Sequence, residues 1–387
     1  MSRAPLTVTA VEVVRFRYPL RDIAPHPTLR VPIYTPGATW ERAVYVVRVL
    51  TDGGVVGEYV GDRGADAHLE GAARILIGRN PLDREGFFAA ARHAALLGAH
   101  YIGIGVLDIA LWDLAGKVYD APLYELLGGA QRPLPAYAST HVGDREPDGL
   151  GSAAAYADLA EQCRDLGYPG FKIHPWPDAT PDEQIAIVRA VGERVGDSMR
   201  LMLDSFNIIP SLGEAVRVGR ACDDYGFFWL EDPYRDGGVS MSGHRRLRQQ
   251  VRTPILALEH VRGLETHVDF LTAEATDFVR VDPDYDGVTG SMKIAHAAEG
   301  FGVDAELHGS GPVRRHMMAA IPNTNFYELS LVHARTGPFH PPVHPGAEDE
   351  LTAVDAAGCV TVSAAPGLGP LDSDFIAAHE TDRATYT

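Results

Sequence analysis

The sequence predicts an α/β protein whose main domain is a parallel β-barrel. Short apolar runs such as GFKIHP, LMLDS and FFWLEDP alternate with helix-like stretches such as PDEQIAIVRAVGERVG. A strand and a helix that recur at this size form a parallel βα unit. Polar residues at or next to the ends of these runs recur at spacings of 32, 27, 28, 23, 26 and 20: Lys172, Asp204, Glu231, Glu259, Asp282, His308 and Glu328. Because all strands of such a barrel end at one mouth, these side chains should converge there.

The chain before the barrel predicts a smaller domain of mixed α and β structure. Residues 7–17 and 43–50 are rich in β-branched side chains, and TDGG then forms a turn into VVGEYVG, which indicates a small antiparallel sheet. Residues 103–127 carry apolar side chains at helical spacing. The segment PLPAYAST at 133–140 then predicts the first barrel strand.

We therefore expect three segments in the chain. Residues 1–132 form an N-terminal α+β capping domain, residues 133–340 form the barrel, and residues 341–387 form a tail that packs back on the capping domain. The tail is rich in Pro and Gly and contains the strand-like run CVTVSA. A length of 387 residues accommodates both domains, since a barrel of this type takes about 250 residues.

Charge and hydropathy exclude some partners. The formal net charge of −18 leaves no basic stripe for nucleic acid or an anionic membrane. No apolar run reaches the roughly 18 residues that span a bilayer, and the N-terminus lacks a signal-peptide core. We predict a cytoplasmic protein.

Two motifs resemble a known family. The helix segment DIALWDLAGK at 108–117, with PLYELLGG at 122–129, resembles a signature of the mandelate racemase branch of the enolase superfamily, and LEDP at 230–233 resembles its barrel signature. The resemblance implies a modified TIM barrel, (β/α)7β, under an α+β capping domain that the C-terminal tail completes. It also implies a homo-oligomeric, Mg²⁺-dependent enzyme that removes the proton α to the carboxylate of a small molecule.

Asp204, Glu231 and Glu259 are the predicted metal ligands. They end three successive strands, and three carboxylates held together without a counter-charge would repel one another. Hard oxygen ligands suit Mg²⁺, with Mn²⁺ as an alternative. Asp232 and His260 stand beside these ligands, and we expect them to support the site without binding the metal.

The family places a Lys-x-Lys pair on the second barrel strand, and this chain has Lys172 followed by His174. By resemblance, the Lys172 ammonium group would neutralise the enolate oxygen. His174 departs from the family pattern. It could act as a base or donate a hydrogen bond to a substrate hydroxyl.

On the opposite face, His308 and Asp282 resemble the family's His-Asp dyad, in which the aspartate fixes the imidazole tautomer. The segment DPDYDGVTG is one residue shorter than the family spacing, so Asp284 is an alternative to Asp282. Glu328 matches the family glutamate that hydrogen-bonds a substrate carboxylate, a role that requires a protonated side chain.

Two capping-domain loops, roughly residues 18–40 and 57–66, are the expected lids that select the substrate. The side chains predicted to contact substrate are His26, Arg30, Tyr34, Arg63, Trp176 and Asn207. Asn207 stands one position after the site of the family asparagine, which Phe206 occupies here.

The favoured function is a hydro-lyase, an acid-sugar or related β-hydroxy-acid dehydratase that yields a 2-keto-3-deoxy acid. The alternative is a racemase or epimerase with His174 and His308 as bases on opposite faces of the α-carbon. A third hypothesis is a binding or scaffold protein that kept the barrel after losing catalysis. The complete set of strand-end residues disfavours this hypothesis.

Overall fold

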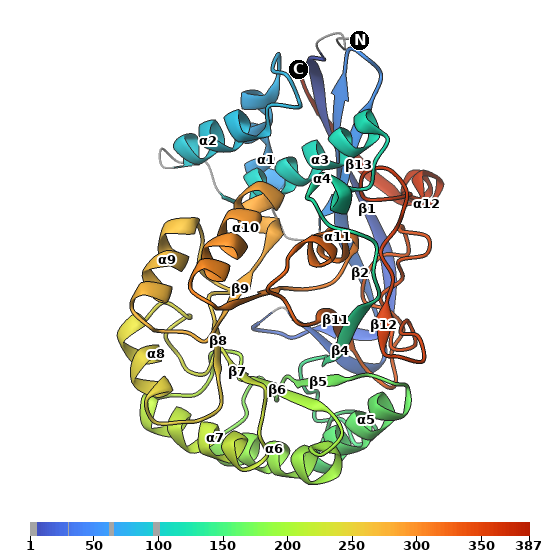
Figure 1. Cartoon of the computed structure of the whole chain (residues 1–387). Helices are drawn as coiled ribbons and strands as arrows, with labels where there is room; N and C mark the ends of the chain where they lie inside the picture. The colour runs from blue at the N-terminus through green and yellow to red at the C-terminus, as the bar shows by residue number, and fades with distance from the viewer. Residues whose placement is uncertain (1–5, 30, 62–65, 96–100) are drawn as a thin grey trace.

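The computed structural model describes residues 6–29, 31–61, 66–95 and 101–387. An antiparallel sheet with its helices lies at one end of the molecule, and a barrel of parallel strands surrounded by helices forms the rest (Figure 1). None of the described helices is both long and apolar enough to cross a membrane.

The capping sheet has four strands in the order β13-β1-β2-β3. They are β1 (Val8–Pro25), β2 (Pro32–Thr51), β3 (Val56–Gly61) and β13 (Glu380–Tyr386). β13 pairs antiparallel with β1, with Val11 opposite Tyr386. The C-terminal tail therefore completes the capping domain as expected. On its way it also places β12 (Cys359–Val360) against the first barrel strand and forms α12 (Ser373–His379).

The expected lid loop at 18–40 is mostly regular structure, so the prediction of a loop is wrong. β1 and β2 continue as a hairpin whose pairing extends from Tyr18↔Arg42 to Pro25↔Pro32. Tyr18, Leu20 and Ile23 are buried and pack in a cluster that includes Phe339 and Val343 of the C-terminal part of the chain. This distant apolar surface holds the hairpin in place, and local sequence cannot reveal it.

The capping helices are α1 (Asp66–Leu76), α2 (Arg84–Ala95), α3 (Tyr101–Tyr119) and α4 (Leu123–Leu126). α3 packs against both β3 and the barrel helix α10, which explains why its described residues are apolar on nearly all sides. Its Asp108 carboxylate accepts hydrogen bonds from the Thr289 backbone N–H at 2.8 Å and from the Thr289 hydroxyl at 2.7 Å. Gly287 lies against Asp108, where a Cβ atom would clash.

Eight parallel strands form the barrel, in the order β10-β9-β8-β7-β6-β5-β4-β11. The strands are β4 (Leu134–Thr140), β5 (Gly170–Ile173), β6 (Arg200–Asp204), β7 (Trp229–Glu231), β8 (Ile255–Ala257), β9 (Phe278–Val281), β10 (Asp304–Leu307) and β11 (Tyr327–Val332). The helices between them are α5 (Ala153–Asp165), α6 (Pro181–Val195), α7 (Leu212–Asp224), α8 (Met241–Arg248), α9 (Leu264–Thr272), α10 (Pro283–Gly300) and α11 (Pro312–Ala320). Because β11 pairs in parallel with β4, the predicted (β/α)7β barrel is confirmed.

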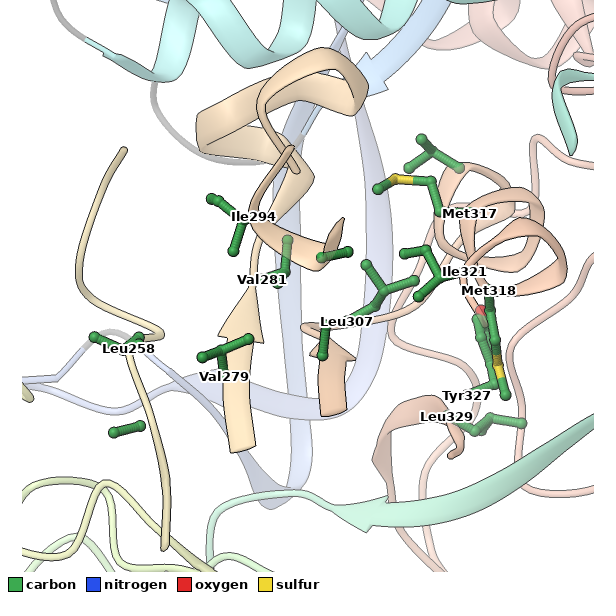
Figure 2. Close-up of a cluster of buried hydrophobic side chains, with 14 of the residues drawn as sticks. Leu258, Val279, Val281, Ile294, Leu307, Met317, Met318, Ile321, Tyr327 and Leu329 are labelled. Atoms are coloured by element: carbon green, nitrogen blue, oxygen red, sulfur yellow. The ribbon is translucent and has the colours of Figure 1, made fainter. Parts of the chain in front are cut away.

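Apolar side chains fix the barrel from inside and outside. Inside, Tyr137, Met202, Trp229 and Leu256 form a buried cluster. Outside, side chains of β9 and β10 meet those of α10 and α11, with Val281 beside Ile294 and Leu307 beside Ile321 in Figure 2. The polar residues near the strand ends therefore project from a barrel that apolar packing holds in place.

Candidate active site

A cavity of about 510 Å³ lies at the carboxyl-terminal ends of the barrel strands. Barrel residues that line it include His174, Asp204, Glu259, His308 and Glu328. The capping hairpin and the C-terminal segment contribute further walls, including Val31, Pro32, Val44, Phe339 and His340. All seven strand-end residues meet at or just beneath this cavity. Lys172 contacts Asp204, Glu231 and Glu328, and His308 contacts Glu259 and Asp282. The close approach of Asp204, Glu231 and Glu259 connects these two groups.

Asp204, Glu231 and Glu259 form an acidic cluster in which one oxygen of each carboxylate lies within 4.8 Å of the others. Asp204 and Glu231 end β6 and β7, and Glu259 follows β8 after Leu258, whose φ of 90° turns the chain. Burial raises the pKa of Glu231 to about 7, although Arg280 and Lys172 act against it. Three oxygen donors at this separation fit a hard divalent cation such as Mg²⁺.

Asp232 and His260 form a pair next to this cluster. His260 Nε2 lies 3.1 Å from Asp232 Oδ2, and the Asn207 side-chain amide donates to the same oxygen at 3.2 Å. The hydrogen bond to Asp232 outweighs desolvation and raises the pKa of His260 to about 9. Asp232, His260 and Glu259 also bring ligand atoms within 4.8 Å of one another, so the supporting role of Asp232 and His260 stays a prediction.

Lys172 lies at the bottom of the site. Its Nζ atom is 2.9 Å from Glu231 Oε2, 2.9 Å from Glu328 Oε1 and 3.6 Å from Asp204 Oδ2. Burial would lower the pKa of Lys172, but these carboxylates outweigh it and hold the pKa well above its usual range. The ammonium group is therefore a fixed positive charge beside the acidic cluster.

The ionisation state of Glu328 depends on its neighbours. It is buried, and besides Lys172 it meets Arg280, whose Nη2 lies 3.3 Å from Glu328 Oε2. Burial alone would raise the pKa of Glu328, but the two cations hold it well below its usual range. These contacts favour the ionised form of Glu328, whereas the predicted hydrogen bond to a substrate carboxylate requires the protonated form.

Arg280 is a residue that sequence reasoning missed. It is fully buried inside the barrel, where its Nε lies 2.7 Å from Glu231 Oε1 and its Nη2 donates to the Tyr137 hydroxyl at 3.1 Å. The signal was an arginine within the apolar run FVRV, two positions before Asp282. Alternate residues of a strand share one face, so Arg280 faces the barrel interior as Asp282 does. A buried cation there needs an acidic partner.

His174 also faces the cavity. Its Nδ1 lies 2.7 Å from the Thr140 carbonyl oxygen, which can only accept a hydrogen bond, so Nδ1 carries a proton. Nε2 then points to Asp204 Oδ2 at 3.1 Å. This orientation leaves Nε2 as the ring atom directed into the site.

His308 and Asp282 form the second histidine-carboxylate pair. His308 Nδ1 lies 3.0 Å from Asp282 Oδ2, and His308 Nε2 lies 3.2 Å from Glu259 Oε1. Asp282 rather than Asp284 contacts the imidazole, because Asp282 directly follows β9 and caps α10. A carboxylate on Nδ1 fixes the tautomer that directs Nε2 into the cavity.

Arg314 on α11 connects this pair to the capping domain. Its Nε donates to the His308 carbonyl oxygen at 2.9 Å, and its Nη2 lies 3.3 Å from Asp282 Oδ1 and 2.7 Å from Asp284 Oδ2. Its Nη1 donates to the Tyr59 hydroxyl at 2.9 Å. One guanidinium group thus contacts both members of the pair and a residue of β3. The sequence offered no signal for this role.

Four of the six predicted substrate contacts lie outside the cavity wall. Trp176 donates from Nε1 to the Leu150 carbonyl oxygen at 2.6 Å and packs on Tyr156, outside the cavity wall. Tyr34 bonds Asp148 at 3.0 Å and stacks on His333. His26 accepts hydrogen bonds from backbone N–H groups in its own turn, and the Asn207 side chain donates a hydrogen bond to Asp232. None of these four lines the cavity. Arg30 and Arg63 lie outside the described residues.

Comparison with known proteins identifies the class. Residues 20–128 match the N-terminal domain of mandelate racemase / muconate lactonizing enzyme, and residues 155–370 match the enolase C-terminal domain-like family. The chain therefore belongs to the mandelate racemase/muconate lactonizing enzyme branch of the enolase superfamily.

Several relatives have named activities. D-xylonate dehydratase of Haloferax volcanii is 29% identical over 88% of this chain and 86% of its own length. D-galactarolactone cycloisomerase of Agrobacterium fabrum is 30% identical over 88% of this chain and 92% of its own. Among solved structures, D-glucarate dehydratase from Agrobacterium tumefaciens complexed with magnesium superposes with a TM-score of 0.87 at 29% identity, covering 98% of this chain and 100% of that one.

Proposed function

We propose that this protein is a magnesium-dependent hydro-lyase that dehydrates an acid sugar or a related β-hydroxy acid. The observation that carries the proposal is the placement of the His308–Asp282 pair beside the acidic cluster, 3.2 Å from Glu259, with Lys172 at the bottom of the same site. Similarity to enzymes named as dehydratases supports this reaction class.

The residues divide the chemistry between them. A divalent cation held by Asp204, Glu231 and Glu259 would supply positive charge to the substrate carboxylate. Lys172 adds a second positive charge next to the oxygens on which negative charge develops. Both are needed because an α-proton next to a carboxylate is very weakly acidic.

His308 is the proposed base. Its Nε2 takes the α-proton, and Asp282 stabilises the imidazolium that forms. The same proton then leaves with the β-hydroxyl group as water. The resulting enol tautomerises to a 2-keto-3-deoxy acid. General base catalysis of this kind contributes about 10²–10⁴-fold to the rate.

The alternative function, a racemase or epimerase, depends on His174. Nδ1–H is bonded to Thr140, so Nε2 would be the second base that a racemase requires, and it would have to give up its contact with Asp204 to act as one. The named activities of the relatives do not favour this alternative. The cytoplasmic location, the homo-oligomer and Mn²⁺ as an alternative cation stay predictions.

The test is a screen of mono- and dicarboxylic sugar acids with Mg²⁺, with semicarbazide detection of 2-keto acid and NMR detection of α-proton exchange in D2O. We expect keto acid from at least one substrate, and no turnover by His308→Asn. The matched control is His296→Asn, an exposed histidine of α10. Epimerisation or exchange without keto acid would replace the dehydratase proposal by the racemase.

A further inference from the structure

We propose that Ser310, Ser330 and His340 form a subsite for an uncharged, hydroxyl-bearing end of the substrate. The preferred substrate would then be a monocarboxylic sugar acid rather than a dicarboxylic one. This inference rests on the proposed function and deepens it. All three residues line the cavity, and His340 belongs to the segment after the last barrel strand.

The local structure of β11 points Ser330 into the cavity. Glu328 and Ser330 are two residues apart on one strand, so both face the barrel interior, with Ser330 about 6.6 Å further along the strand. A register shift follows Ser330, and Leu331 has a φ of 62°. Such a bulge redirects a side chain, and here the consecutive residues Ser330 and Leu331 both line the cavity.

The hydrogen bonds determine which hydroxyl of the subsite donates and which can accept from a substrate. Ser310 Oγ donates its proton to the Glu328 carbonyl oxygen at 2.9 Å, and it accepts from the Ser330 backbone N–H at 2.7 Å. The Ser330 hydroxyl, 2.7 Å away, must therefore donate to Ser310 Oγ. Ser330 Oγ keeps acceptor capacity that faces His340 Nε2, at 3.3 Å, and the cavity. An acceptor of this kind suits a substrate hydroxyl and repels a carboxylate.

The charged residues around this end of the cavity also favour an uncharged substrate group. Among the described lining residues, Arg314 is the only arginine or lysine, and Asp282 and Asp284 already bind it. Nearby Arg315 is paired with Asp349 at 2.7 Å. Burial lowers the pKa of His344 to about 4, so this histidine is neutral at pH 7.

Acidic and apolar groups make up much of the remaining wall. Glu348 and Glu350 add negative charge, whereas Leu331, Phe339 and Pro341 add apolar surface. A second carboxylate placed here would lose its hydration, and the one described lining cation, Arg314, is already bound by two carboxylates, which is unfavourable. A sugar hydroxyl can pair with Ser330 while its carbon atoms contact the apolar wall.

The first experiment measures binding, so that it does not depend on turnover. Isothermal titration of the His308→Asn variant with Mg²⁺ compares monocarboxylic and dicarboxylic sugar acids of equal length and configuration. We expect the monocarboxylic acid to bind about tenfold more tightly or better. Equal affinity, or tighter binding of the dicarboxylic acid, would overturn the subsite. If the wild-type enzyme then forms no keto acid from a well-bound acid, the proposed function fails and the subsite stands.

The second experiment changes the subsite. His340→Arg should shift the ratio of kcat/KM for the dicarboxylic over the monocarboxylic acid upward by about tenfold, because it adds the missing cation. Ser330→Ala should raise KM about fivefold for an acid with the distal hydroxyl and leave KM unchanged for its deoxy analogue. Ser198→Ala, in the turn after α6 and outside the cavity wall, is the matched control. An unchanged preference in His340→Arg would contradict the assignment.

Discussion

The Tyr59 hydroxyl accepts a hydrogen bond from Arg314 Nη1 at 2.9 Å, which joins the capping sheet to the barrel. The same hydroxyl donates to Asp284. Arg314 also contacts Asp282 and the His308 carbonyl oxygen, so the position of the capping domain is tied to the geometry of the proposed base.

Tyr59→Phe should therefore lower kcat about 5- to 30-fold with little change in the affinity for Mg²⁺, because one buried hydrogen-bonding partner is lost to Arg314 and Asp284. Steady-state kinetics and metal titration check this. Tyr225→Phe removes a hydroxyl that bonds Glu193 on the outer helices, and this control should retain full activity. Full activity in Tyr59→Phe would show that the connection is only structural.

Asp282→Asn and Asp284→Asn should differ. Asp282 contacts the His308 ring at 3.0 Å, whereas Asp284 contacts Arg314. We expect Asp282→Asn to lower kcat by about 10²–10⁴-fold through loss of the required tautomer, and Asp284→Asn to lower it less than about tenfold. Kinetics with the substrate identified in the screen measure both. The reverse order would make Asp284 the partner of the base.

Removing Arg280 should destabilise the fold. The guanidinium lies between Glu231 and Glu328, and Arg280→Met would leave these buried carboxylates with one cation fewer. Loss of one partner from a buried ion pair costs about 3–5 kcal/mol of unfolding free energy. Urea unfolding followed by circular dichroism measures the change, with exposed Arg252→Met as the control. A loss below about 1 kcal/mol would mean that Lys172 is sufficient to stabilise both carboxylates.

Metal should stabilise the protein through the acidic cluster. Mg²⁺ at a hundred times its Kd should add about 2.7 kcal/mol to the unfolding free energy, and EDTA should remove this gain. Asp204→Asn should abolish both the rise in Tm and the activity. Asp232→Asn, beside the cluster, should retain most of the Tm response. A full response in Asp204→Asn would place the cation elsewhere.

Asp108 should make stability depend on pH. Burial raises its pKa from 3.8 to about 7. The folded state therefore binds this proton more tightly than the unfolded state, and the stabilisation present below pH 3.8 is lost as the pH rises through about 7. The loss amounts to at most about 4 kcal/mol. Asp108→Asn should reduce the pH dependence by this amount, whereas exposed Asp197→Asn should leave it unchanged, as unfolding between pH 4 and 8 would show. Glu231, whose pKa burial also raises to about 7, contributes to the dependence that remains.

Much of the fold could be predicted because it depends on local periodicity. The apolar runs that end in Lys172, Asp204 and Glu231 became β5, β6 and β7, and the βα alternation predicted the barrel that the strand order confirms. Parallel strands must end at one mouth, so residues spread over the chain could be grouped in advance. The roles of these residues stay proposals.

Other features depended on contacts between distant segments. The hairpin at 18–40 could not be predicted, since its buried face packs on Phe339 and Val343. The ionised state of Glu328 follows from Arg280, and the choice of Asp282 over Asp284 follows from where β9 ends.

The sequence by itself determined the order of strands and helices and which polar residues meet at the barrel mouth, because side-chain periodicity and parallel βα topology are local rules. Only the tertiary structure decided the ionisation states, the pairing of Arg314 with Tyr59, and the cavity wall at Ser330 and His340. Electrostatic energies and cavity shape depend on distances between residues remote in sequence, and folding alone sets those distances.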